Sequence, residues 1–313
     1  MLMGATPPTA PFVFKADAPM DAEHVSIEVL ECDRGVLGES PVWSVREQVL
    51  YWVDIRSQLL LRYDPTMRAV AQWKFDEAVG SVVLRASGGV VLSLTSGFTS
   101  FSAESGFELL LRSPEAHIPN QRFNDGRCDP RGRYWVGSMS DVDRVPTGSL
   151  YRIDPDWTAH RWLTGVTIPN SLCWSPDGRQ MYFADTIDSS IFVFDYDLDT
   201  GRIANKRLFA TTEGRTGSPD GSTVDAEGYI WNAEFGSWCV TRYAPDGRVD
   251  RRIRLPVQCP TSCAFGGPSF DTLYVTTARH RLSVAEQEAQ PLSGQVLAVQ
   301  VGVRGLAEPE FAG

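Results

Sequence analysis

Two acids and two amides recur at one position of a repeated segment, and their side chains are of the types that bind divalent cations. They are Glu39, Asn124, Asn170 and Asp220. Hard cations such as Ca²⁺, Mg²⁺ and Mn²⁺ take carboxylate and amide oxygens, whereas His and Cys are the ligands expected for Zn²⁺. None of the four histidines falls at this position. Two carboxylates that face one another also need a neutralising partner. We therefore hypothesise that Glu39, Asn170 and Asp220 form an oxygen-rich cation site.

Turns are the alternative explanation, because Asn-Asp-Gly and Pro-Asp-Gly are common turn tripeptides. Pro176-Asp177-Gly178 and Pro245-Asp246-Gly247 lie directly beside strand-like segments, and we interpret them as turns. Asn124-Asp125-Gly126 and Pro219-Asp220-Gly221 are each followed by a separate turn signal a few residues later. The spacing therefore favours a shared site for Asn124 and Asp220 over a pair of turns.

These residues belong to a unit that repeats about six times along the chain. Segments rich in aromatic and β-branched residues follow Gly- or Asp-containing turns, which is typical of strands. The segments are YWVD at 51–54, VVLSL at 90–94, YWVG at 134–137, MYFAD at 181–185, YIWNA at 229–233 and LYVTT at 273–277. An equivalent position recurs some residues ahead of each segment. We call the six residues at this position the repeat column: Glu39, Gly80, Asn124, Asn170, Asp220 and Thr261. Its members are separated by 41, 44, 46, 50 and 41 residues.

Repeats of this length with several strands each predict an all-β fold, a six-bladed β-propeller with four-stranded antiparallel blades around a central channel. Innermost strands line such a channel, so the repeat column predicts a ring of side chains. We expect one propeller domain over residues 25–313, preceded by a mobile tail over residues 1–24. The segment VSIEVLEC at 25–32 is expected to pair beside QVLAVQV at 295–301 and close the ring. Helices should be few, since no long segment has a 3.6-residue apolar period.

Composition and charge argue against several classes of partner and of cellular location. A net charge of −10 disfavours nucleic acid. The longest apolar runs fall far short of the ~18 residues that a membrane span needs. The first residues lack the basic and apolar regions of a signal peptide. The six cysteines are scattered without a CxxC pair, which favours reduced thiols over disulfides. We predict a cytoplasmic protein, either a monomer or a small homo-oligomer.

Arg122 lies two residues before Asn124, so in an extended stretch both side chains can point to the same side. Its guanidinium could bind substrate hydroxyls or a developing oxyanion, and a surface salt bridge is the equal alternative. Asp141 and Asp143 follow the strand at 134–137 and could add an acceptor at the same rim, or could simply be solvated. No GxSxG, HExxH or phosphate-loop motif offers another chemistry.

Several segments closely resemble the gluconolactonase/regucalcin (senescence marker protein) family. They are LGESPVW at 37–43, RFNDG at 122–126, PNS at 169–171, PDG at 219–221, FGGP at 265–268 and LYVTTA at 273–278. The resemblance runs from about residue 26 to about residue 303, in the family's order. It implies a six-bladed propeller that hydrolyses sugar lactones with one divalent metal in the channel.

Carried over by position, the resemblance implies that Glu39, Asn170 and Asp220 are the metal ligands. It also implies that Asp220 is the general base, and that Arg122 and Asn124 hold the substrate.

Two positions depart from the family's pattern. Ser171 stands where the family usually has glycine, which we expect to alter only the local turn. Val142 stands where related proteins place a substrate-binding glutamate. Asp141 and Asp143 flank it, and either could replace that glutamate; Asp141 is our candidate for the substrate contact. The sequence thus leaves substrate preference open.

The expected function is a metal-dependent lactonase that opens a glucono-, xylono- or arabinono-type sugar lactone to the aldonic acid. The cation would be Ca²⁺, Zn²⁺, Mn²⁺, Mg²⁺ or Fe²⁺, since each can bind two carboxylates and an amide. An organophosphate or aryl-ester hydrolase of the related propeller type is a second reading. A non-catalytic calcium-binding propeller is a third.

Overall fold

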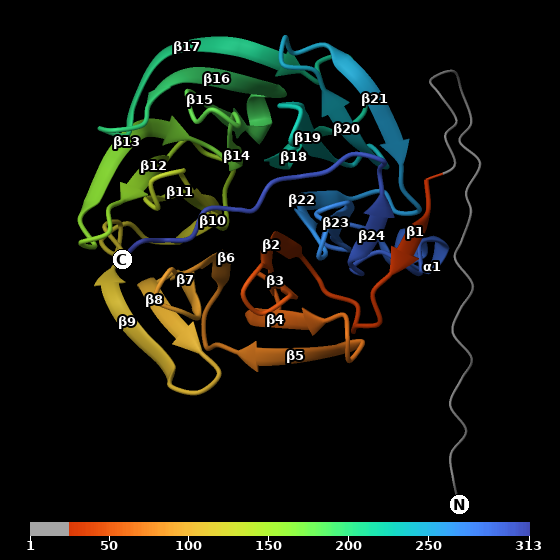
Figure 1. Ribbon diagram of the computed structural model, residues 1–313, viewed down its shortest axis with the longest axis horizontal. Coiled ribbons are helices and arrows are strands. Elements are labelled where there is room, and N and C mark those ends of the chain that lie inside the picture. The colour runs from red at the N-terminus through yellow and green to blue at the C-terminus, as the bar shows by residue number, and fades with distance from the viewer. Residues whose placement is uncertain (1–24) are drawn as a thin grey trace, which may run out of the picture.

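A computed structural model describes residues 25–313, which form six four-stranded antiparallel sheets. The sheets stand as blades in a ring around a central channel (Figure 1). The predicted six-bladed propeller is therefore confirmed. The tail expected over residues 1–24 lies outside the described residues.

Each blade runs from an inner strand at the channel to an outer strand at the rim, and we number the blades in chain order from β2. The inner strands are β2 (Gly38–Ser44), β6 (Val79–Leu84), β10 (Gln121–Cys128), β14 (Pro169–Trp174), β18 (Ser218–Val224) and β22 (Pro260–Gly266). The second strands are β3 (Val49–Asp54), β7 (Val90–Leu94), β11 (Tyr134–Ser140), β15 (Gln180–Asp185), β19 (Ile230–Phe235) and β23 (Thr272–Thr277).

The third strands are β4 (Leu59–Asp64), β8 (Gly97–Ser102), β12 (Gly148–Ile153), β16 (Ser190–Asp197), β20 (Cys239–Tyr243) and β24 (Leu297–Gln300). The outer strands are β5 (Ala69–Lys74), β9 (Gly106–Arg112), β13 (Ala159–Val166), β17 (Arg202–Thr211), β21 (Val249–Arg254) and β1 (Ile27–Val29). The helices of the described part are short: α1 (Val284–Ala289) and the 3-10 helix η1 (Thr186–Asp188).

The ring closes as the sequence predicts, because the first strand completes the last blade. β1 pairs antiparallel with β24, and Glu28 lies opposite Ala298. The last blade thus contains strands from both ends of the described chain, which ties the first blade to the sixth.

The core lies between neighbouring blades, because both faces of every blade pack against another blade. Large aromatic side chains fill these spaces: Trp43 stacks on Tyr274 at 5.8 Å between the first and last blades, and Trp135 meets Trp174 at 6.4 Å between the third and fourth. Inner strands are buried on both faces, whereas outer strands such as β5 are largely exposed. All six cysteines are free thiols. No helix in residues 25–313 has the length and apolar character to cross a membrane.

All six repeat-column residues lie on inner strands, and the pairing of each inner strand with its neighbour shifts register beside the column residue. The shift falls between Glu39 and Val42 in the first blade and between Asn170 and Cys173 in the fourth. Such bulges bend a strand and redirect a side chain. The column is therefore a set of equivalent, redirected positions rather than of turns.

Two column positions join blades instead of lining a site. A Cβ on Gly80 would lie 2.5 Å from the Phe123 carbonyl oxygen, so the close approach of β10 requires glycine there. Thr261 is fully buried and donates to the Gly38 carbonyl across the closure of the ring. The remaining four positions are free to form a site.

The last ten residues, 304–313, cross the ring over the channel (Figure 1). They form isolated bridges that pair Gly305 with Asp225 and Phe311 with Arg85. Phe311 is fully buried and meets the Trp157 ring at 4.8 Å. This segment covers the end of the channel where the inner strands finish.

Candidate metal centre and substrate pocket

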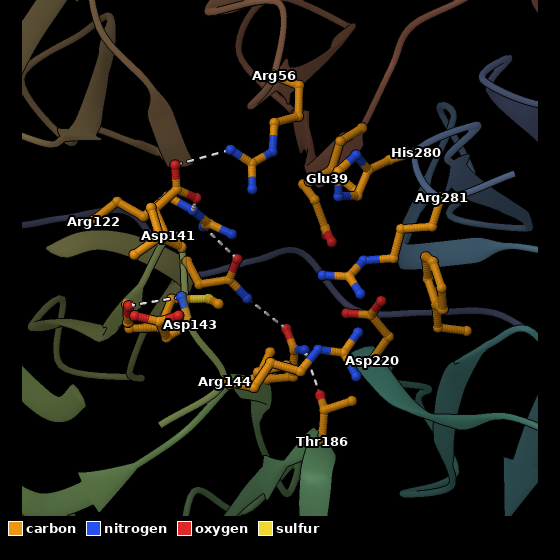
Figure 2. Close-up of a pocket in the computed structure, with 18 residues that line it drawn as sticks. Glu39, Arg56, Arg122, Asp141, Asp143, Arg144, Thr186, Asp220, His280 and Arg281 are labelled. Carbon is orange, nitrogen blue, oxygen red and sulfur yellow. Dashed lines mark hydrogen bonds and ion pairs between the residues drawn. The ribbon is translucent and has the colours of Figure 1, made fainter. Parts of the chain in front are cut away.

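A pocket opens at the end of the channel where the inner strands begin, and five of the six blades contribute to it (Figure 2). Its apolar lining is Leu37, Met139, Val142, Ile168 and Phe235. Its charged and polar lining is Glu39, Arg56, Arg122, Asn124, Ser140, Asp141, Asp143, Arg144, Asn170, Thr186, Asp220, His280 and Arg281. The predicted site residues all belong to this pocket.

Glu39, Asn170 and Asp220 line its floor and come from the first, fourth and fifth blades. Figure 2 shows the Glu39 and Asp220 carboxylates directed into the pocket. Their exposed fractions are only 7%, 2% and 7%. Asp220 Oδ1 is buried and has no hydrogen-bond partner among residues 25–313. A buried carboxylate oxygen without a donor is unfavourable unless a ligand occupies it. The floor of the pocket thus presents an acceptor that the protein itself leaves unsatisfied.

Negative charge is crowded at this floor. Burial raises the pKa of Glu39 to about 8, and the charge of Asp125 adds to the rise. Burial also raises the pKa of Asp220 well above its ordinary value, and the charges of Glu39 and Asp125 raise it further. The ionised forms of both acids are therefore disfavoured until a positive charge joins them.

A hydrogen-bond relay from the third to the fifth blade orients Asn170. Arg122 Nη1 donates to Asn124 Oδ1 at 2.7 Å, and Asn124 Nδ2 donates to Asn170 Oδ1 at 3.1 Å. Asn170 Nδ2 then donates to Thr186 Oγ1 at 2.7 Å, and Thr186 Oγ1 donates to the Pro219 carbonyl at 2.9 Å. Since a carbonyl oxygen has two lone pairs, Asn170 Oδ1 keeps one for a ligand.

Arg122 and Asp141 lie at the rim of the pocket and bind one another. Arg122 Nε donates to Asp141 Oδ1 at 2.6 Å, and Arg56 Nη1 donates to Asp141 Oδ2 at 2.8 Å (Figure 2). Both Asp141 oxygens therefore bind guanidinium groups, which lowers the pKa of this carboxyl despite its partial burial. Because Arg122 is buried and Asp141 is partly exposed, this pairing differs from the surface salt bridge considered for Arg122. Substrate contact by Arg122, Asn124 and Asp141 stays a prediction.

Two aspartates hold the backbone just ahead of two floor residues by accepting hydrogen bonds from its amides. Asp54, at the end of β3, accepts from the Val36 and Leu37 amides at 2.7 and 3.1 Å, just ahead of Glu39. Asp185, at the end of β15, accepts from the Thr167 and Ile168 amides in the same way, just ahead of Asn170. These hydrogen bonds fix the backbone two residues ahead of Glu39 and of Asn170, so both side chains are directed to the floor of the pocket.

Known proteins with a similar sequence identify the family of this propeller. Residues 37–279 match the family described as the SMP-30/Gluconolactonase/LRE-like region. The chain belongs to this family.

The similarity extends over nearly the whole length of its relatives. The chain is 39% identical over 289 residues to a 6-deoxy-6-sulfogluconolactonase of Pseudomonas putida, covering 91% of this chain and 99% of the relative. It is 36% identical over 296 residues to regucalcin of Xenopus laevis, covering 92% and 99%. Among solved structures, regucalcin of Agrobacterium tumefaciens, titled a calcium-binding protein, has a TM-score of 0.87 at 29% identity and covers 90% of this chain and 96% of that one.

Ser171, one of the two departures from the family's pattern, does more than alter the local turn. It is fully buried with a φ of 62°, and its Oγ donates to the Asp220 carbonyl. Asn232 Nδ2 donates to the same carbonyl at 3.0 Å. Ser171 thereby joins the backbones of two floor residues. Val142, the other departure, is 65% exposed at the pocket mouth.

Part of the pocket was not predicted from the sequence, namely Arg56, Arg144, Thr186, Phe235 and Arg281. A signal was available, since Thr186 directly follows a second strand and Phe235 ends one. Arg56 stands two residues after β3. The ends of the second strands face the same end of the channel as the starts of the inner strands, so a second set of equivalent positions could have been compared.

The floor fits a hard divalent cation by its donor set. Two buried carboxylates and an amide oxygen offer only oxygen ligands, and one of these oxygens lacks any other partner. Over residues 25–313, no group of three or more His, Cys, Asp or Glu side chains is placed to hold a metal ion. A site here would therefore need the Asn170 amide as well as the two acids, as the sequence predicts.

Asn124→Ala is expected to weaken divalent-cation binding by about 10- to 100-fold, because it removes the donor that orients Asn170 Oδ1. The measurement is calorimetric titration of chelator-treated protein with Mn²⁺. Asn205→Ala is the matched control, since the exposed Asn205 amide donates to Asp195 at 2.7 Å on an outer strand. Equal affinity in both variants would show that the relay does not position a metal ligand.

Proposed function

We propose that this protein hydrolyses a sugar lactone to the open aldonic acid, with one divalent cation held by Glu39, Asn170 and Asp220. The observation that carries the proposal is the buried, unpartnered Asp220 oxygen beside a second buried acid at the floor of an open pocket. The family and the 39% identical sulfogluconolactonase support lactone hydrolysis as the reaction.

The bound cation would supply Lewis acidity, polarising the lactone carbonyl and stabilising the charge that develops on its oxygen. Asp220 acts as the general base, and its carboxylate accepts a proton from the attacking water. Arg122 and Asn124 hold the lactone ring against the floor, and the relay through Asn124 keeps Asn170 in place. The apolar side chains Leu37 and Phe235 limit water around the ring.

The test is hydrolysis by purified protein after chelator treatment, assayed by pH-stat on glucono-, xylono- and arabinono-lactones. Activity should fall to the spontaneous rate without metal and return with one equivalent of a divalent ion. Full activity in the metal-free protein would refute the metal role.

Calcium binding without lactone hydrolysis would instead support the non-catalytic propeller. The 29% identical regucalcin structure, titled a calcium-binding protein, favours testing that second candidate directly. Calorimetric titration with Ca²⁺ on the same metal-free protein makes the distinction. A cytoplasmic location and a monomeric or small homo-oligomeric state complete the proposal.

A further inference from the structure

Positively charged side chains gather at the mouth of the pocket, although the net charge of the protein is −10. Four arginines line the pocket, and Figure 2 shows the Arg144 and Arg281 side chains extending over it from different sides. Arg144 stands on the loop between β11 and β12, and Arg281 on the loop between β23 and α1. Such a local reversal of sign attracts anions.

The partners of these arginines differ. Arg122 and Arg56 share the Asp141 carboxylate, as described above. Arg144 and Arg281 have neither an ion pair nor a side-chain hydrogen bond with any residue from 25 to 313. Burial and the charges of Arg144 and Arg56 lower the pKa of Arg281, so these guanidiniums lie close enough to repel one another. Two unpaired, mutually repelling guanidiniums at a pocket mouth are suited to a shared anion.

The backbone around Arg281 fixes where its side chain leaves the loop. Arg281 has a φ of 74°, a left-handed conformation that glycine or asparagine adopts more easily. The loop is fixed on both sides, because the His280 amide donates to the Val36 carbonyl at 2.9 Å and Ser283 caps α1. The strained residue carries a side chain that lines the pocket.

The charges of the pocket do not balance once the floor is neutralised. A divalent cation would offset Glu39 and Asp220. The four arginines then face only Asp141 and Asp143, which leaves a surplus of two positive charges. His280 adds none at neutral pH, since burial and the nearby arginines Arg56 and Arg281 lower its pKa. The surplus lies at the exposed mouth, away from the buried floor.

We propose that Arg144 and Arg281 bind an anionic group, a sulfonate, phosphate or carboxylate, carried by the lactone at the far end of its carbon chain from the carbonyl carbon. This inference rests on the proposed function, because the carbonyl must lie at the floor for the other end to reach the mouth. It assigns the substrate class as an acidic sugar lactone rather than a neutral one.

The test compares glucono-δ-lactone with its 6-phosphate and its 6-deoxy-6-sulfonate, which differ only in the group expected at the mouth. Wild-type kcat/KM should be at least about tenfold higher for one or both anionic lactones. In the double variant Arg144→Gln with Arg281→Gln, this preference ratio should fall by about tenfold or more. Arg248→Gln removes one positive charge from a turn where the side chain is 83% exposed, and should keep the wild-type ratio.

A second measurement separates this inference from the proposed function. Calorimetric titration with gluconate and 6-phosphogluconate reports binding without turnover. In low salt, 6-phosphogluconate should bind more tightly than gluconate, because it carries the additional phosphate. Equal binding of both acids with equal hydrolysis of all three lactones would overturn the inference and leave the lactonase standing. Selective binding of 6-phosphogluconate that the double variant loses, without lactone hydrolysis, would support the anion site and refute the lactonase.

Discussion

Asp220→Asn should lower lactone turnover by about 1000-fold or more while making the metal-free protein more stable. The turnover falls because the variant loses both the proposed general base and one carboxylate ligand. The stability rises because Asp220 is buried, lacks a partner for Oδ1 and repels Glu39. Removing that charge should add about 1 kcal/mol to the free energy of unfolding in chelator. Rate assays and urea denaturation of the same preparations measure the two effects.

The matched control is Asp246→Asn, which changes the same residue type in an exposed turn. Asp246 binds Arg248 at 2.7 Å, and its side chain is 54% exposed. Turnover and stability should both stay near wild type, because exposed ion pairs contribute little. A metal-free Asp220→Asn protein less stable than wild type would show that the carboxylate serves the fold rather than a ligand.

Glu308→Gln is expected to destabilise the fold by about 3 kcal/mol, although it lies far along the chain from any predicted site residue. Glu308 forms an ion pair with Arg127 across the end of the channel that the C-terminal segment covers, and both side chains are nearly buried. Glu308 Oε1 also accepts from Thr223 Oγ1 at 3.2 Å. The variant removes the carboxylate that pairs with the buried Arg127 guanidinium and leaves only the nearby charge of Asp125 to offset it. Urea denaturation with chelator present in all samples gives the change in unfolding free energy.

Glu310→Gln provides the control within the same segment. Glu310 pairs with Arg46 at 3.1 Å, where the two side chains are 29% and 52% exposed, so its loss should change stability by less than about 1 kcal/mol. Similar effects of the two variants would mean that the segment contributes through its backbone and Phe311 rather than through the buried pair.

The repeat explains why the floor of the pocket was predictable. Equivalent positions on inner strands point to one axis, so Glu39, Asn170 and Asp220 could be grouped without coordinates. The turn signals also separated similar tripeptides correctly. Gly178 has the positive φ of a turn, at 67°, whereas Asp220 lies within β18.

Side-chain pairing was less accessible to sequence reasoning. Arg122 and Asn124 were expected to face substrate, and the structure shows that they also bind Asp141 and Asn170. Hydrogen bonds between blades depend on distances that strand spacing does not specify. The C-terminal segment gave no signal either, because Glu308 and Phe311 stand outside the repeat.

By itself, the sequence determined the number of blades, the closure of the ring and the residues at the channel floor, because these follow from a period and from strand patterning. Tertiary structure alone decided which loops reach the mouth and which charges remain unpaired there. Arg144 and Arg281 come from loops of different blades with no shared spacing. Their proximity depends on how those loops fold back over the channel, and therefore on packing rather than on local sequence.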